Sequence, residues 1–223
     1  MSNVPLRFTA FYFVLVLCIT NFAFADVEIK AYNKKYSWKR EWTLKIIEEL
    51  DKDFFHEDKN SLLNIKINKD DLSILDCVGY NEASRDDKKD FWVVFFSALT
   101  RAESAFNENA RSVILKGHRS WGLLQFAKQT AKVYCSIDPP KSSVLNGGDN
   151  LFCGLKLISW QLQGAPLASG RKIRPDLDGQ LFGKKMFQWG PLRQNDFRGR
   201  LLFVNWFKDH LRQLKFCKKT NEA

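Results

Sequence analysis

The chain has 223 residues, of which 45% are hydrophobic and 27% are charged, and this composition excludes a disordered, collagen-like or coiled-coil protein. Its 35 lysine and arginine residues exceed its 25 aspartate and glutamate residues, so the net charge of +10 favours an acidic polymer or surface as partner. The 7 Trp, 5 Tyr and 19 Phe residues suffice to fill a core and still leave rings for a binding groove.

The N-terminus has the pattern of a secretion signal. Arg7 precedes an apolar run over residues 8–22, and Ala23-Phe24-Ala25 places small residues where a signal peptidase cleaves. The run is shorter than the roughly 20 residues that span a bilayer as a helix. We therefore expect residues 1–25 to be a cleaved signal peptide, with export to the periplasm or the extracellular space and no stable membrane insertion afterwards. An uncleaved membrane anchor is the alternative.

Four cysteines follow the signal, namely Cys77, Cys135, Cys153 and Cys217. An even number in an exported chain predicts two disulfides, for which the sequence alone allows three pairings. We favour Cys135–Cys153, which closes a local loop, and Cys77–Cys217, which ties the C-terminal region to the segment before the core. A zinc site is the alternative, but the chain has no CxxC motif and its three histidines lack ligand spacing. We expect no metal and no cofactor.

The periodicity of apolar residues predicts a mainly α-helical protein. Helices are expected at 38–55, 86–106, 121–134, 149–163 and 197–214, and Asp86-Asp87 suit the first turn of the second of these. Residues 60–76 fit either a short hairpin or a loop. No repeat or linker divides the chain after the signal, so we expect one domain over 86–217, an N-terminal extension at 26–85 and a tail at 218–223. The extension is expected to complete the fold, dock a partner or gate a cleft.

Glu103 shares the apolar stripe of the helix expected at 86–106. At 100° per residue, Trp92, Phe96, Leu99 and Phe106 fall within roughly 60° of it around the helix axis. A carboxyl held against aromatic rings is desolvated, which raises its pKa toward the range that a general acid needs near neutral pH. Glu103 is therefore a candidate catalytic acid. The alternative is that the helix ends before this residue and leaves its side chain in solvent or beside an arginine.

Four sequence blocks, in order, resemble the catalytic core of soluble lytic transglycosylases and goose-type lysozymes. They are ESAFNENARS from Glu103, SWGLLQ from Ser120, NLFCGL from Asn150 and MFQWGPLR from Met186. The family patterns are E-S-x-F-N-x-x-A-x-S, G-L-M-Q, N-[IL]-x-x-G and A-Y-N-A-G-P-G-R. The resemblance spans about 98–193, with a leucine in place of the methionine of the second pattern.

The resemblance implies a lysozyme-like catalytic domain that acts on peptidoglycan glycan strands. Glu103 would be the single acid/base that cleaves the β-1,4 bond between N-acetylmuramic acid and N-acetylglucosamine. The residues implied to shape or bind the substrate groove are Ser104, Ser120, Trp121, Gly122, Gln125, Asn150, Phe187, Gln188 and Trp189. For these residues, ordinary roles as a turn glycine, a helix-face amide, a helix cap or a core ring remain alternatives.

The fourth block departs from the family pattern at two positions. The family tyrosine, whose hydroxyl hydrogen-bonds the catalytic carboxyl, aligns with Phe187, so this hydroxyl is absent. Tyr134 and Tyr80 are candidates to replace it. Gln188 aligns with the family asparagine and keeps an amide.

The resemblance leaves the outcome of the reaction open. A transglycosylase uses the sugar's own N-acetyl group and 6-hydroxyl and leaves a 1,6-anhydro end, whereas a hydrolase uses water that is usually positioned by a second carboxylate. The candidates for a second carboxylate are Asp138, Asp149, Asp176, Asp178 and Asp196, and no motif singles one out, so we favour a transglycosylase. A catalytically impaired peptidoglycan-binding domain is the alternative from another class. Export and the lack of a recognisable module argue against nucleic-acid binding, and we expect a monomer.

Overall fold

The structure is a computed structural model that describes residues 27–33, 35–52, 62–113, 119–135, 144–163, 179–183 and 188–218. The side chains of Val133 and Tyr134 are outside this description. The predicted signal peptide at 1–25 also lies outside the described residues.

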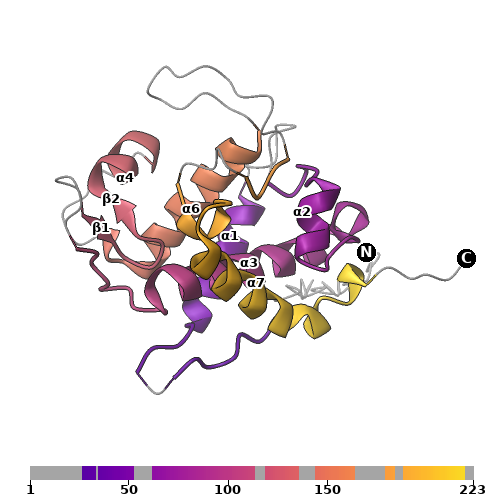
Figure 1. The fold of residues 1–223 in the computed structure, drawn as a ribbon, viewed down its shortest axis with the longest axis horizontal. Helices are drawn as coiled ribbons and strands as arrows, with labels where there is room; N and C mark the ends of the chain where they lie inside the picture. Colours follow the sequence, from indigo (N-terminus) through magenta and orange to yellow (C-terminus); the bar gives the residue numbers. More distant parts are fainter. Residues whose placement is uncertain are drawn as a thin grey trace, which may run out of the picture.

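The described chain is mainly α-helical, as predicted (Figure 1). Its elements, in order, are α1 (Arg40–Asp51), α2 (Lys69–Ile74), the 3-10 helix η2 (Tyr80–Glu82), α3 (Arg85–Ser104), β1 (Ser120–Trp121), β2 (Phe126–Ala127), α4 (Lys128–Cys135), α6 (Gly147–Leu162), the 3-10 helix η4 (Gly190–Leu192), α7 (Phe197–His210) and the 3-10 helices η5 (Leu211–Gln213) and η6 (Lys215–Cys217). In Figure 1, α1, α3, α6 and α7 gather in the middle, with β1, β2 and α4 at one end and α2 at the other.

The central helix α3 begins at a capped N-terminus. Ser84 accepts a hydrogen bond from the backbone N–H of Asp87, and its hydroxyl donates to the Asp87 carboxylate at 2.7 Å. Asp86 and Asp87 lie in the first turn, as predicted, where they complement the helix dipole. The ten residues from Phe91 to Thr100 are all buried, so this helix forms the axis of the core.

Aromatic rings join α3 to α7. The Phe95 and Phe203 ring centroids lie 5.1 Å apart, and those of Phe91 and Phe207 lie 5.3 Å apart, both in edge-to-face arrangements. All four rings are fully buried. Full burial of such a side chain contributes about 1.5–3 kcal/mol, so this interface fixes α7 and the segment before it against α3.

The N-terminal extension is part of the same core. Trp42, Ile46 and Leu50 of α1 are buried, and α1 packs against α6 and α3. The segment before α1 is held against the end of α7, because the Lys30 N–H donates to His210 Nε2 at 3.2 Å. The described part of the extension therefore helps to complete the fold, which is one of the three roles expected for it.

Two expectations from periodicity need correction. Residues 62–76 form neither a hairpin nor a plain loop, because their second half is the helix α2. The helix expected at 121–134 begins only at Lys128, since β1, a turn and β2 occupy residues 120–127. Gly122 and Gln125 both have positive φ in this turn, a conformation that cannot continue a right-handed helix.

Two disulfides cross-link distant parts of the described chain. Cys135 is bonded to Cys153 and Cys77 to Cys217, the two pairs that the sequence analysis favours. The first joins α4 to α6, and the second joins the segment after α2 to η6 across 140 residues of sequence. A cross-link over so long a loop restricts the unfolded chain strongly.

Candidate active site

Glu103 lies in the last turn of α3, so the helix does not end before it. The chain reverses at once after the helix, where Ala105 and Phe106 both adopt left-handed φ values of 51° and 65°. Phe106 is therefore past the helix rather than on its stripe, but its ring is still buried. Consecutive non-glycine residues in this conformation carry strain of the kind that collects at functional sites.

The surroundings of the Glu103 carboxyl hold its pKa at about 7. Burial against the core is the main cause, because it disfavours the charged form, and the negative charge of Asp196 acts in the same direction. The positive charge of Arg193 and a hydrogen bond from the Gly190 N–H oppose them. At neutral pH a large fraction of Glu103 is therefore protonated and able to donate a proton.

Asp196 lies close enough to Glu103 for its negative charge to raise the pKa of the Glu103 carboxyl. It is the N-cap of α7, where its Oδ1 accepts a hydrogen bond from the Gly199 N–H at 2.9 Å. A Cβ at either Gly190 or Gly199 would collide with Asp196 Oδ2, so only glycine allows the carboxylate to approach so closely. Asp196 is one of five aspartates that the sequence does not distinguish as a second carboxylate, and Gly190 and Arg193 are not among the predicted site residues. The Asp-x-x-Gly spacing at the start of α7 is the sequence signal that could have identified Asp196 as the N-cap of this helix.

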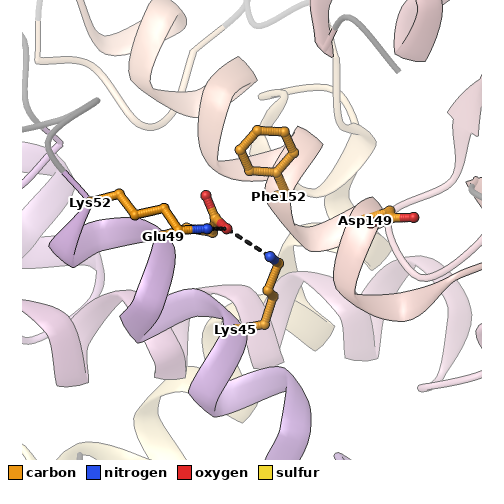
Figure 2. Close-up of a pocket in the computed structure, with 5 residues that line it drawn as sticks. All are labelled: Lys45, Glu49, Lys52, Asp149 and Phe152. Carbon is orange, nitrogen blue, oxygen red and sulfur yellow. Dashed lines mark hydrogen bonds and ion pairs between the residues drawn. The ribbon is translucent and has the colours of Figure 1, made fainter. Parts of the chain in front are cut away.

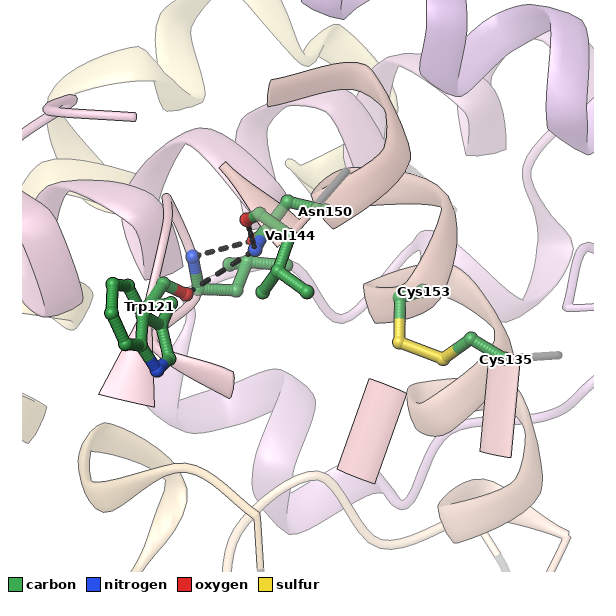
Figure 3. The surroundings of a disulfide bond; sticks show 6 residues. Trp121, Cys135, Val144, Asn150 and Cys153 are labelled. Atoms are coloured by element: carbon green, nitrogen blue, oxygen red, sulfur yellow. Dashed lines mark hydrogen bonds between the residues drawn. A yellow bond between two sulfur atoms is a disulfide. The ribbon is translucent and has the colours of Figure 1, made fainter. Parts of the chain in front are cut away.

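The second and third blocks meet at Asn150. Its Oδ1 accepts from the Leu124 N–H at 2.8 Å, and its Nδ2 donates to the carbonyls of Val144 at 2.9 Å and Trp121 at 3.3 Å (Figure 3). A Cβ on Gly122, which has φ of 78°, would collide with this amide and with the Val144 carbonyl. Asn150 thus fixes the turn that joins β1 to β2.

Further contacts bring the remaining blocks to the same turn. The Gly122 N–H donates to the Ala110 carbonyl of the first block at 2.9 Å. The Trp189 indole of the fourth block donates to the Leu124 carbonyl at 3.1 Å. Each of the four blocks therefore contacts another directly, although they are spread over about 90 residues of sequence.

Three residues predicted to bind substrate lie inside the protein instead. Asn150 and Trp189 are 2% and 1% exposed, and Gly122 is also buried. Their polar groups already bond to the protein backbone, so a sugar cannot reach them. These three residues therefore build the turn, which is the groove-shaping role that the resemblance allows, and direct contact with substrate does not suit their burial.

Other predicted groove residues remain accessible. Ser104, Ser120, Trp121, Gln125 and Gln188 are all partly exposed. The Ser104 hydroxyl donates back to the Thr100 carbonyl at 3.2 Å, which suits its expected role of ordering the end of α3. Gln125 Nε2 donates to the Gly122 carbonyl at 2.8 Å and so braces its own turn.

The missing tyrosine hydroxyl is not supplied by Tyr80. This ring is fully buried, and its hydroxyl accepts from the Trp92 indole at 3.0 Å. Trp92 and Glu103 are eleven residues apart on one helix, which places them about 16 Å apart along its axis. Phe187 and the Tyr134 side chain lie outside the described residues.

A separate pocket of about 370 Å³ opens between α1 and α6 (Figure 2). It is lined by Lys45, Glu49, Lys52, Asp149 and Phe152, and the predicted catalytic carboxyl is not among them. Glu49 is buried and pairs with Lys45 at 2.7 Å and Lys52 at 2.6 Å. The charges in this pocket are therefore compensated within the protein.

Within the described ranges, histidine, cysteine, aspartate and glutamate do not form a group of three that could hold a metal ion. No helix among the described residues has the length and apolar character needed to cross a membrane.

A carboxyl that is partly protonated at neutral pH, at the end of the buried central helix, has the protonation state that a general acid needs. Residues 81–169 match the family model of the transglycosylase SLT domain, a family whose members cleave peptidoglycan, so this part of the chain is similar to that domain. No match was found among curated protein sequences.

Solved structures of Bd0314 DslA have a similar fold. A glutamate-to-glutamine mutant of that protein is 21% identical with a TM-score of 0.61, over 85% of this chain and 98% of that chain. Its wild-type form 2 is 23% identical with a TM-score of 0.58, over 80% and 91%. A second glutamate-to-glutamine mutant is 22% identical with a TM-score of 0.56, over the same shares. At these identities the likeness concerns the fold, and it extends well beyond the SLT match into the N-terminal extension.

Proposed function

We propose that this protein is a lytic transglycosylase that cuts the β-1,4 bond between N-acetylmuramic acid and N-acetylglucosamine, with Glu103 as its single acid/base. The observation that carries the proposal is the position of Glu103 in the last turn of the buried helix α3. Burial there raises its pKa to about 7, which keeps a proton on this carboxyl under conditions where an ordinary glutamate has lost it.

In the proposed mechanism, Glu103 first donates its proton to the glycosidic oxygen as the bond from that oxygen to C1 breaks. Positive charge develops at C1, and the sugar's N-acetyl group compensates it. The Glu103 carboxylate that results is stabilised by the Gly190 N–H and by the Arg193 charge. It then takes the proton from the 6-hydroxyl as O6 bonds to C1, which restores the acid and leaves a 1,6-anhydro end.

The position of Asp196 favours this outcome over hydrolysis. A hydrolase needs a second carboxylate that is free to hold water, but Asp196 caps α7 and packs against Gly190 and Gly199. Asp149 lines the pocket between α1 and α6 rather than the surroundings of Glu103. Asp138, Asp176 and Asp178 lie outside the described residues.

We further propose that the protein is exported and that 86–217 is its catalytic domain, acting as a monomer on peptidoglycan strands. The N-terminal sequence pattern and the two disulfides support export, since disulfides form in oxidising compartments. The packing of α1 into the core supports an extension that is needed for the catalytic domain to fold.

Mass spectrometry of the fragments released from purified peptidoglycan sacculi tests the proposal. We expect fragments that end in 1,6-anhydro sugars, and we expect none from Glu103→Gln. Reducing ends would show a hydrolase instead. If neither protein releases fragments, the enzyme proposal fails and a catalytically impaired wall-binding domain becomes the favoured alternative.

The pH dependence of cleavage should report the charges around Glu103. We expect kcat/KM to fall as the pH rises through about 7, because the acid loses its proton. Asp196→Asn removes a negative charge and keeps a residue able to cap α7, so it should lower the Glu103 pKa and move the fall to lower pH. Arg193→Gln should raise this pKa and move the fall to higher pH.

The pH profiles of kcat/KM for wild type and these two variants provide the measurement. Asp149→Asn is the matched control, since it removes the same charge at a residue that is not among those that shift the Glu103 pKa, and it should leave the profile in place. Shifts in the same direction for Asp196→Asn and Arg193→Gln would contradict the assignment of the pH dependence to Glu103.

A further inference from the structure

Three cationic side chains surround the Trp121 ring. The Arg111 guanidinium lies 4.9 Å from the ring centroid, the Lys128 ammonium 5.1 Å and the Arg119 guanidinium 5.7 Å. Each distance is within the range of a cation–π contact. We call Arg111, Arg119, Trp121 and Lys128 the Trp121 cluster.

The strand register explains how these charges converge. β1 and β2 are antiparallel with Ser120 opposite Ala127, so the next pair outward is Arg119 and Lys128. Arg111 reaches the ring from the other edge, because it forms an antiparallel bridge with Trp121. Like charges opposite one another on a sheet are destabilising, so the fold itself holds three positive charges together at an energetic cost.

No acidic partner for this cluster is found among the residues that the structure describes. Cations elsewhere in the protein pair closely with carboxylates, as Lys39 does with Glu108 at 2.7 Å and Lys208 with Asp76 at 2.6 Å. Arg119 Nε is buried and has no hydrogen-bond partner within the described chain. A buried donor without a partner is destabilising, and an anion from outside the protein would satisfy it.

The Trp121 cluster adjoins the turn that joins the four sequence blocks. The Trp121 carbonyl accepts from the Asn150 amide, and the indole lies on the side away from α6 (Figure 3). Trp121 directly precedes the turn from Gly122 to Gln125 that joins the four blocks. A ligand held at the cluster is therefore attached to the same turn as the predicted groove.

We propose that the Trp121 cluster is a binding site for the carboxylates of the peptides carried by peptidoglycan, which rests on the proposed function. Guanidinium groups bind carboxylates through paired hydrogen bonds, and the indole face supports the guanidinium planes. Uncharged sugars form no ion pairs, so a cluster of three cations favours an anionic ligand. The cluster would thus select glycan strands that still carry free peptide carboxylates.

Co-sedimentation with sacculi tests the site without requiring cleavage. The binding experiment uses the full chain carrying Glu103→Gln, which leaves the wall intact, with untreated sacculi and with sacculi whose carboxylates have been converted to amides. We expect amidation to weaken binding about tenfold, since it removes the partners of three exposed cations, each of which contributes modestly to binding. The triple variant Arg111→Gln, Arg119→Gln, Lys128→Gln should bind both kinds of sacculi equally, at the weaker level.

A matched triple variant controls for net charge. Lys66→Gln, Lys69→Gln and Lys215→Gln remove the same charge from exposed positions in and around α2 and η6, away from β1 (Figure 1). This control should keep the preference for untreated sacculi. Equal binding of both sacculi by the parent protein, or loss of the preference in the control, would overturn the site. Failure of the proposed function is a separate result, namely the absence of 1,6-anhydro fragments.

Discussion

Glu103→Gln is expected to lower the rate of fragment release from sacculi about 10³-fold, within the range of 10²–10⁴ that proton transfer by a positioned acid contributes. Glutamine has nearly the same shape and can still accept the hydrogen bond from the Gly190 N–H. It carries no transferable proton, so only the proton-transfer step is lost. The measurement is the initial rate of release, quantified by chromatography.

The same substitution is expected to stabilise the fold, and the gain should depend on pH. The Glu103 pKa is about 7 in the folded protein against an ordinary value of 4.5, so between these values the folded state binds a proton that the unfolded state has lost. Wild-type stability therefore falls as the pH rises from about 4.5 to about 7. Thermal unfolding should show no gain for Glu103→Gln below this window and the full gain above it.

Glu108→Gln provides the matched control within the same sequence block. Its carboxylate pairs with Lys39 at 2.7 Å on the surface, so its loss should change stability by less than about 1 kcal/mol and leave the rate intact. A Glu103→Gln protein that keeps more than a tenth of the wild-type rate would rule out Glu103 as the acid.

Glu103 could be found from the sequence because part of its environment is local. The run of apolar residues before it on one helix predicts its desolvation, and that burial is the main cause of its raised pKa. Gly190, Arg193 and Asp196 come from a segment about 90 residues later, which the chain brings to Glu103 through the packing of α7 on α3. Periodicity carries no information about that approach.

The residues of the turn were harder to assign for a different reason. An asparagine or tryptophan in a family motif is compatible with a role in the groove and with a role beneath it, and the difference lies in burial. Asn150 and Trp189 both bond to the backbone around Leu124. The short strands β1 and β2 have only two residues each, too few for an alternating pattern to be recognised.

Asn150→Ala is expected to destabilise the protein by about 3–5 kcal/mol, because it leaves the Leu124 N–H and the Val144 and Trp121 carbonyls without their side-chain partner. The site is 2% exposed, so water cannot easily replace the amide. Urea unfolding at equilibrium measures the loss.

Asn150→Asp changes the hydrogen-bonding capacity and charge of the side chain while nearly keeping its size. The carboxylate keeps an acceptor for the Leu124 N–H but turns an oxygen toward two carbonyls, and it buries a charge. Because burial raises the pKa of such a carboxyl, the variant should be more stable at low pH, where the protonated acid can donate to one carbonyl, and should lose stability as the pH rises.

Asn146→Ala is the control on the same helix, since Asn146 is the exposed N-cap of α6 and its loss should cost about 1 kcal/mol. If Asn150→Ala costs no more than this control, Asn150 does not organise the turn. If it costs the expected amount, fragment release by the residual folded protein should fall as well, because the Asn150 amide holds the turn that carries Gln125 and the Trp121 cluster. The fold and the predicted groove would then depend on one buried side chain.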